Sequence, residues 1–254
     1  MKISVVIPAY NEEKYITDCL KSILNQEEKP DEIIVIDNNS NDKTAAIATS
    51  LGIRVVTEKI QGMISARNRG FNTAQYDIIA RTDADAIVPP DWIKRIKKNF
   101  QQDKMLVGLS GPMHFYSSPV IVKVSKWPTN IYSKAVKQAI KQDFLIGPNM
   151  ALRKSAWELV KNEVCLNDKD VHEDIDLSLH LATFGKIKFD AKIIVQASFR
   201  RYKKLTPYFE YPYRTIKTIR RHKKTLLEMQ SRKFMNKVLS QSRTLIKQLQ
   251  QFPD

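Results

Sequence analysis

Cysteine and long apolar runs are both scarce in this sequence. The two cysteines, Cys19 and Cys165, are too few for a disulfide framework or for a zinc site made of cysteine alone. We expect both thiols to be buried as small apolar side chains in a reducing compartment. No apolar run approaches the roughly 18 residues of a membrane span, and the opening segment is too short and too β-branched for a signal peptide. The sequence therefore predicts a cytoplasmic protein.

Internal repeats and low-complexity linkers are also absent, so the 254 residues are expected to form one core, or one core with an appendage. Hydrophobic residues at 43% and charged residues at 27% are typical of a folded soluble protein. The net charge of +15 is uneven, because residues 201–254 carry 14 Lys or Arg against three acids, which leaves +4 for residues 1–200. The basic character therefore belongs to the C-terminal segment and says nothing direct about the core.

Short apolar runs alternate with helical patterns along the chain. Strands are expected at 3–7, 32–37, 53–56, 78–80, 105–110, 187–189 and 193–195. Helices are expected to end near 25 and 51, and to cover 62–72, 91–100, 154–161 and a segment from about 171. The fourfold alternation of strand and helix in the first hundred residues indicates βαβ units, and hence a parallel sheet with helices on both faces.

Three of these strands end in or lead into residues that could contact a ligand. The residues concerned are Pro8, Ala9, Tyr10, Asp37, Asp83 and Asp85. Ligands of parallel sheets bind at the carboxyl ends of the strands, where the turning backbone can aim Asp83 and Asp85 at one point. Two hard oxygen ligands beside a diphosphate suit Mg²⁺ or Mn²⁺. For an isolated Asp-x-Asp the alternative is a polar strand end followed by a helix cap.

Six segments together resemble the family 2 glycosyltransferases of the nucleotide-diphospho-sugar, or GT-A, fold. They are residues 5–13, 36–44, 62–70, 82–85, 147–153 and 172–174. The second segment departs from the family pattern at Asn38, Asn39 and Lys43. The resemblance implies an α/β, Rossmann-like, mostly parallel sheet flanked by helices. Its nucleotide-sugar-binding half would be 1–110 and its acceptor-binding half 111–204, with a basic helical extension at 205–254.

The resemblance also implies which residues hold the donor, a nucleotide sugar for which uridine is the commonest base in the family. They are Pro8, Ala9, Tyr10, Glu12, Asp37, Asn38, Gly62, Arg67, Asp83, Ala84 and Asp85. Asp85 would ligate the metal directly, with Asp83 on the ribose or on the metal through water. Asp37 would accept a hydrogen bond from the base and Arg67 would add charge near the diphosphate. The alternatives are a plain surface aromatic for Tyr10 and a solvated helix arginine for Arg67.

Asp174 is the general base that the resemblance implies. The attacking hydroxyl needs a base opposite the leaving group, and a helix start keeps a carboxylate ionised. Capping of the first helical turn is the alternative role for Glu173 and Asp174. The acceptor or phosphate side would comprise Trp92, Gly147, Asn149, Glu173 and Arg200.

Two features of many relatives are missing. The region 196–201 lacks the histidine metal ligand, so Arg200 is expected to reach the phosphates instead. The Gln-x-x-Arg-Trp motif of processive polysaccharide synthases is absent, which favours transfer of one sugar. We therefore expect an inverting, metal-dependent glycosyltransferase acting on a glycan or lipid-linked acceptor in cell-surface glycan synthesis.

Two other functions compete for the same residues. A nucleotidyltransferase on a related fold would need a glycine-rich, basic loop after the first strand, and residues 8–12 have neither glycine nor positive charge. A nucleic-acid-binding protein would account for the pI of about 9.7. The charge is confined to the C-terminal segment and no binding motif occurs, so no nucleic-acid partner is expected.

Apolar residues recur in the C-terminal segment at steps of three, four or seven from 214 to 252, which predicts one or two amphipathic helices. A basic face beside an apolar face suits an anionic membrane surface, and a lipid-linked acceptor would give it a purpose. Packing on the catalytic core and a dimer contact are the alternatives. We expect peripheral attachment to the inner face of the membrane through residues beyond about 205.

Overall fold

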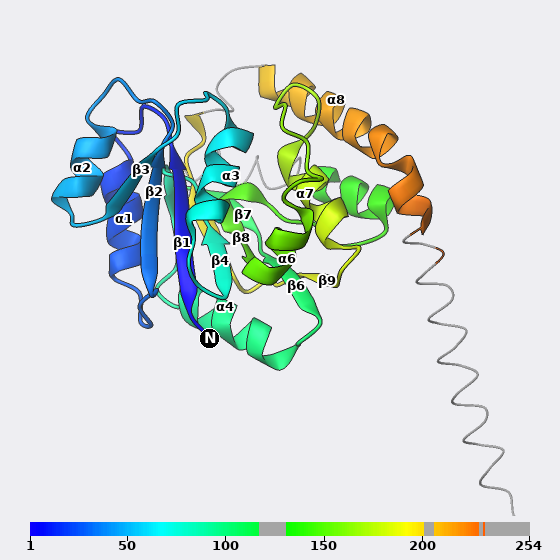
Figure 1. The fold of residues 1–254 in the computed structure, drawn as a ribbon, viewed down its shortest axis with the longest axis horizontal. Coiled ribbons are helices and arrows are strands. Elements are labelled where there is room, and N and C mark those ends of the chain that lie inside the picture. The colour runs from blue at the N-terminus through cyan, green and yellow to red at the C-terminus, as the bar shows by residue number, and fades with distance from the viewer. Residues whose placement is uncertain (117–130, 201–205, 229–230, 232–254) are drawn as a thin grey trace, which may run out of the picture.

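The computed structural model describes residues 1–116, 131–200, 206–228 and 231. Seven strands form the central sheet, in the order β3-β2-β1-β4-β8-β6-β9 (Figure 1). They are β1 (Ile3–Ala9), β2 (Glu32–Asp37), β3 (Arg54–Thr57), β4 (Ile78–Arg81), β6 (Leu106–Ser110), β8 (Met150–Arg153) and β9 (Lys186–Phe189). All neighbours pair in parallel except β8, which is antiparallel to both β4 and β6. The predicted mostly parallel α/β sheet is confirmed.

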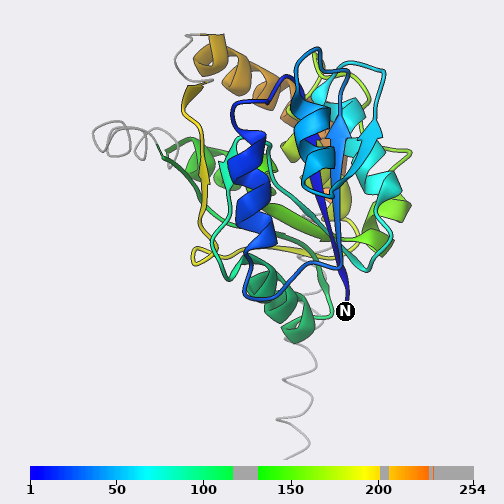
Figure 2. The same cartoon turned by 90° about the vertical axis from the view of Figure 1, so that its left-hand side faces the viewer.

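Helices cover both faces of this sheet. One hydrophobic cluster joins alternate residues of β1 to α1 (Ile16–Leu24), α2 (Thr44–Ser50) and α4 (Trp92–Gln102). A second cluster joins the opposite face to α3 (Met63–Thr73), α6 (Lys154–Val160) and α7 (Glu173–Leu181). Figure 2 shows α1 and α3 on opposite sides of the strands. Because every side chain of β1 is buried, its uninterrupted apolar run is explained by cover on both faces.

A small second sheet lies beside the first. It consists of β5 (Ala86–Ile87), β10 (Val195–Ala197) and β7 (Met113–Phe115), in the order β5-β10-β7. The strand expected at 193–195 therefore belongs to this sheet rather than to the central one. Since β5 directly follows Asp85 and β10 pairs with it, the segment after β10 is brought to the end of β4.

The described start of the C-terminal segment packs on the core. Helix α8 (Thr206–Arg221) lies at the same end of the molecule as the carboxyl ends of β1 and β2 (Figure 1). Leu226 and Ile219 pack with Ile175 and Leu179 of α7, and the Thr218 hydroxyl accepts a hydrogen bond from the His172 amide at 2.7 Å. The helices predicted beyond 231 lie outside the described residues. No helix within the described ranges has both the length and the apolar character needed to cross a membrane.

Candidate active site

A cleft of about 1200 Å³ opens at the carboxyl ends of the central strands. Most of the predicted site residues line it, namely Pro8, Ala9, Tyr10, Glu12, Asn38, Gly62, Asp83, Ala84, Asp85, Gly147, Glu173, Asp174 and Arg200. The described lining does not include Asp37, Arg67, Trp92 or Asn149. The structure therefore brings the donor-side carboxylates and the predicted base into one hollow.

Arg200 spans two of the acidic residues at this site. Its Nε donates to Asp85 Oδ2 at 2.9 Å, and its Nη2 pairs with Glu12 Oε1. Its guanidinium also lies 4.5 Å from the ring centroid of Tyr15, a cation–π geometry. The prediction placed Arg200 near phosphates, and the structure places it among the carboxylates that would face those phosphates.

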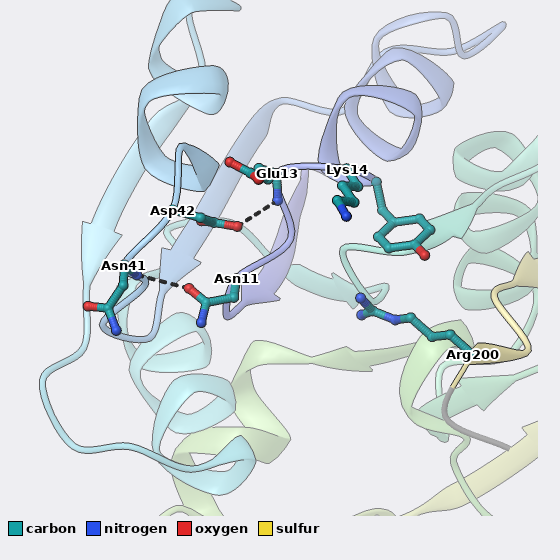
Figure 3. Close-up of a pocket in the computed structure, with 7 residues that line it drawn as sticks. Asn11, Glu13, Lys14, Asn41, Asp42 and Arg200 are labelled. Carbon is teal, nitrogen blue, oxygen red and sulfur yellow. Dashed lines mark hydrogen bonds between the residues drawn. The ribbon is translucent and has the colours of Figure 1, made fainter. Parts of the chain in front are cut away.

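A smaller pocket of about 480 Å³ also has Arg200 in its lining. Figure 3 shows Arg200 pointing across it toward the loop that carries Asn11, Glu13 and Lys14. This loop is bonded to the loop after β2, with Asn41 N donating to Asn11 Oδ1 at 2.9 Å and Glu13 N to Asp42 Oδ2 at 3.0 Å. These bonds explain the polar run at 38–42, which fixes the position of Glu12 in addition to leading into α2.

The carboxylates Glu12, Asp83 and Asp85 fit a hard divalent cation. Glu12 Oε2 is buried and has no hydrogen-bond partner among the described residues. Burial raises the pKa of Glu12, Arg200 opposes this shift, and the charges of Asp85 and Asp83 add to it. An orphaned oxygen in a group of like charges is a place where Mg²⁺ or Mn²⁺ would be stabilised. Asp83 and Asp85 were predicted for this role, and Glu12 was predicted only as a donor contact.

Arg81, which the sequence analysis missed, links the donor side to the predicted base. It is 1% exposed at the end of β4. Its Nη2 donates to Asp83 Oδ1 at 3.2 Å and its Nη1 to Glu173 Oε1 at 2.8 Å, while Asp174 Oδ1 lies 3.6 Å away. Burial alone would lower the pKa of Arg81, but these three carboxylates raise it above its ordinary value. The arginine therefore remains charged in the protein interior. The sequence did contain one sign of a special role for Arg81, because a charged residue ends an otherwise apolar strand.

Asp174 has the surroundings of a general base. It is 9% exposed, and its Oδ2 accepts a hydrogen bond from Gly147 N at 2.8 Å. Its Oδ1 has no hydrogen-bond partner among the described residues. Burial and the charge of Glu173 raise the pKa of Asp174 to about 7. The helix start was expected to keep this carboxylate ionised, but burial and Glu173 act in the opposite direction, and a base with a pKa near neutrality suits proton abstraction.

Glu173 is held by two buried arginines. Arg67 Nη1 donates to Glu173 Oε2 at 3.0 Å, and Arg81 donates to the other oxygen. Although burial alone would raise the pKa of Glu173, Arg81 and Arg67 lower it to about 2. The residue before α7, His172, makes no side-chain capping bond, and Glu173 and Asp174 lie in the first turn of the helix, as the capping alternative expects. Glu173 also pairs with two arginines, which capping alone does not require.

Arg67 lies inside the protein. Its exposure is 0%, so the alternative of a solvated helix arginine is wrong. Besides Glu173, its guanidinium donates to Asn68 Oδ1. Its charge therefore lies beside the base motif, in contact with Glu173 of the cleft lining, while Arg67 itself is not part of that lining.

Asn38 and Gly62 shape the donor side of the cleft. The Asn38 amide donates to the carbonyls of Glu58 and Ile60 at 3.0 and 2.7 Å, and its oxygen accepts from Gly62 N at 2.9 Å. A carboxylate could not donate those two bonds, which explains the departure from the family pattern. Gly62 has φ 147°, and a Cβ there would lie 2.3 Å from Asp168 Oδ2.

The remaining predicted residues are buried and are not part of the described cleft lining. Asp37 is 8% exposed and its carboxylate accepts a hydrogen bond from Ser40 N. Trp92 Nε1 donates to Asn149 Oδ1 at 3.1 Å, and the Asn149 amide donates to the carbonyls of Pro112 and Ile193. Trp92 and Asn149 were expected on the acceptor or phosphate side, and the structure places them in a buried hydrogen-bonded link between the segments that lead into the two sheets.

Comparison with known proteins points to the family that the six sequence segments resemble. The model of "Glycosyl transferase family 2" matches residues 4–160. A Methanococcus voltae protein named as a dolichyl N-acetyl-alpha-D-glucosaminyl phosphate 3-beta-D-2,3-diacetamido-2,3-dideoxy-beta-D-glucuronosyltransferase is 26% identical over 216 residues, which cover 78% of this chain and 67% of that protein.

Two solved structures share the fold. S. aureus TarS 1–349 in complex with UDP-GlcNAc has a TM-score of 0.59 at 18% identity, covering 78% of this chain and 58% of TarS 1–349. Glucosyl-3-phosphoglycerate synthase from Mycobacterium tuberculosis, in complex with Mn²⁺, UDP and glucosyl-3-phosphoglycerate, has a TM-score of 0.57 at 18% identity. The match covers 90% of this chain and 79% of the synthase chain. The chain thus spans less than two thirds of TarS 1–349, and these likenesses concern the fold alone.

Proposed function

This chain belongs to glycosyl transferase family 2, and from that premise we propose that it transfers one sugar from a UDP-linked donor to an acceptor hydroxyl with inversion. One observation carries the proposal. The carboxylates of Glu12, Asp83 and Asp85 line the same cleft as Asp174, whose Oδ1 is buried without a hydrogen-bond partner among the described residues. A site for a nucleoside diphosphate and a base with a pKa near neutrality are the two parts that such a displacement needs.

The donor side would bind the nucleotide at the ends of β1, β2 and β4. Tyr10, which is exposed at 45%, would stack on the base, and we assign to Asp37 the hydrogen bond from the ring N–H. A divalent cation held by Asp83, Asp85 and Glu12 would supply positive charge beside the departing diphosphate. Arg200 already lies at those carboxylates and would provide a second positive group for the phosphates.

The acceptor side would use Asp174. Its Oδ1 takes the proton of the attacking hydroxyl, while the bond from Gly147 N to Oδ2 fixes the orientation of the carboxylate. Arg81, 3.6 Å from Oδ1, favours the ionised form that acts as the base. Glu173 holds Arg81 in place through the 2.8 Å bond.

The acceptor is proposed to be a glycan or lipid-linked hydroxyl at the inner face of a membrane. The name of the M. voltae relative describes a dolichyl phosphate. In this chain α8 exposes Phe209, Tyr213 and Ile216 at 74%, 66% and 51%, spaced four and three residues apart on one helical face. Other residues of α8, including Glu210 and Arg214, line the cleft. An apolar stripe at the cleft edge is where a membrane surface would deliver such an acceptor.

The test is incubation of the full chain with a panel of nucleotide sugars, with Mn²⁺ or with a chelator, followed by mass spectrometry. We expect slow hydrolysis of a UDP-linked sugar that needs the cation, and its loss in Asp85→Asn. No hydrolysis of any donor, together with condensation of a sugar phosphate with a nucleoside triphosphate, would instead identify a nucleotidyltransferase.

A further inference from the structure

A second group of metal-ligand side chains lies between α7 and the end of α8. Asp176 and His180 are one turn apart on α7, and His222 directly follows α8. Their ligand atoms all lie within 4.8 Å of one another. None of the three is part of the cleft lining. We propose that this cluster binds one Zn²⁺, separately from the carboxylates at the strand ends.

The distances within the cluster favour a common ligand. His222 Nε2 lies 2.8 Å and His180 Nε2 3.9 Å from the same oxygen, Asp176 Oδ1. The two imidazole rings cross at 87° with centroids 4.8 Å apart, so they are not a stacked pair. Two imidazole nitrogens and one carboxylate oxygen are a ligand set that Zn²⁺ accepts.

The surroundings of the cluster orient its members. The other nitrogen of His180, Nδ1, lies 3.5 Å from Glu163 Oε2, the carboxylate–histidine arrangement common behind metal ligands. The second oxygen of Asp176 accepts the Cys165 amide at 2.9 Å. Asp176 and His222 are buried at 1% and 6% exposure, whereas His180 is half-buried. The His180 side is therefore the one closest to solvent, from which an ion and a water as fourth ligand would enter.

The proposed ion would have a structural role. The cluster lies entirely beyond residue 160, where the match to the family model ends. A bound Zn²⁺ would fasten the end of α8 to α7, the helix that begins with Glu173 and Asp174. Because other residues of α8 line the cleft, this attachment would also hold that wall of the proposed active site.

The experiment uses the full chain stripped of metal with a chelator and titrated with Zn²⁺ alone. We expect one equivalent to bind with a Kd of about 1 µM or tighter. His180→Asn and His222→Asn keep a polar amide near Asp176 but remove a ligand, and each should weaken binding by at least about 100-fold. Glu163→Gln should weaken it by about 10-fold. His180→Cys should restore binding, because a thiolate is itself a zinc ligand.

Two further measurements are needed. One shows whether the Zn²⁺ is bound at this cluster or at the cleft carboxylates, and the other shows whether the cluster is a zinc site or only a hydrogen-bonded triad. Asp85→Asn should keep the Zn²⁺ equivalent, so the result does not depend on the proposed transferase activity. Zn²⁺ should raise the Tm of the wild-type chain but not that of His180→Asn. If the wild-type chain binds no Zn²⁺ at tens of micromolar, or if the His180→Asn and His180→Cys variants bind alike, the cluster is only a hydrogen-bonded triad and the proposal fails. If the His222→Asn variant does not fold, the comparison of His180→Asn with His180→Cys is by itself sufficient to test the zinc site.

Discussion

Arg81 is a buried cation shared by acids with different proposed tasks, since we assign Asp83 to the donor side and Asp174 to the acceptor side. The pairing of Arg81 with Glu173 could not be read from the sequence, because the two residues are 92 positions apart. The acids themselves were predictable, because strand ends and a helix start mark them. Trp92 shows the converse error, since an aromatic residue next to a site motif proved to be buried core with 0% exposure.

The pH dependence of transfer follows from Arg81. Asp174 must be ionised to act as a base, so wild-type kcat/KM should fall as the pH drops through the Asp174 pKa of about 7. Arg81→Met removes a cation that opposes this raised pKa, so the acidic limb should move up by about one pH unit or more. Arg81→Lys, which keeps the charge, should move it less. An acidic limb at the same pH in Arg81→Met would mean that Arg81 does not act on the base.

Substitution of the base itself should separate binding from chemistry. Asp174→Asn should leave calorimetric affinity for UDP and Mn²⁺ unchanged and reduce transfer by about 100-fold or more. The matched control is Asp170→Asn, because Asp170 pairs with Lys217 on the outside of the protein and should have no effect on transfer. Equal losses of donor binding, transfer and fold in Asp174→Asn would show that its role is structural.

At the scale of elements, most strands of the central sheet could be predicted, but the small second sheet and the strand directions that depend on distant partners could not. The strand at 32–37 was predicted at its observed bounds, and the alternation of strands and helices gave the parallel half of the sheet. The three residues of β10 are too few to show a period, and their pairing with β5 and β7 depends on contacts distant in sequence. The antiparallel insertion of β8 was missed for the same reason.

One face of helix α8 packs on the protein and the other is exposed to solvent, and the exposed face can be tested for membrane binding. One packs on α7, as the core-packing alternative required, and the other exposes Phe209, Tyr213 and Ile216. The full chain should float with anionic liposomes at low salt and less at high salt. Replacing these three residues by Ser should reduce flotation without unfolding the protein.

The control for this experiment replaces three other exposed apolar residues by Ser. Met105, Leu159 and Leu166 are exposed at 60%, 56% and 74% and lie outside α8. That variant should float like the wild-type chain. A full chain that stays at the bottom of the gradient in low salt would contradict the membrane role and leave the exposed stripe for a partner chain.

At the scale of the whole molecule, thermal unfolding can test the boundary expected between residues 204 and 205, where the catalytic domain would end and the C-terminal extension begin. Leu226 is 6% exposed and packs on α7, while its neighbour Leu227 is 56% exposed. Leu226→Ala should cost about 2–5 kcal/mol, and thus lower Tm by at least about 5 °C, whereas Leu227→Ala should change it little. A chain ending at residue 202 should lose at least as much as Leu226→Ala. If that truncated chain kept the full Tm, α8 would be an independent appendage.

The ion pairs of Arg200 make the two proposed ligands of the cleft thermodynamically coupled. In the free protein Arg200 occupies oxygens of Asp85 and Glu12, so a cation arriving alone competes with an internal one. A diphosphate offers Arg200 a replacement anion, so each ligand should remove part of the cost of binding the other. Calorimetry should find Mn²⁺ bound several-fold more tightly with UDP than without it, and that ratio should shrink in Arg200→Gln. Such heterotropic cooperativity would keep the site from filling with metal until a donor is present.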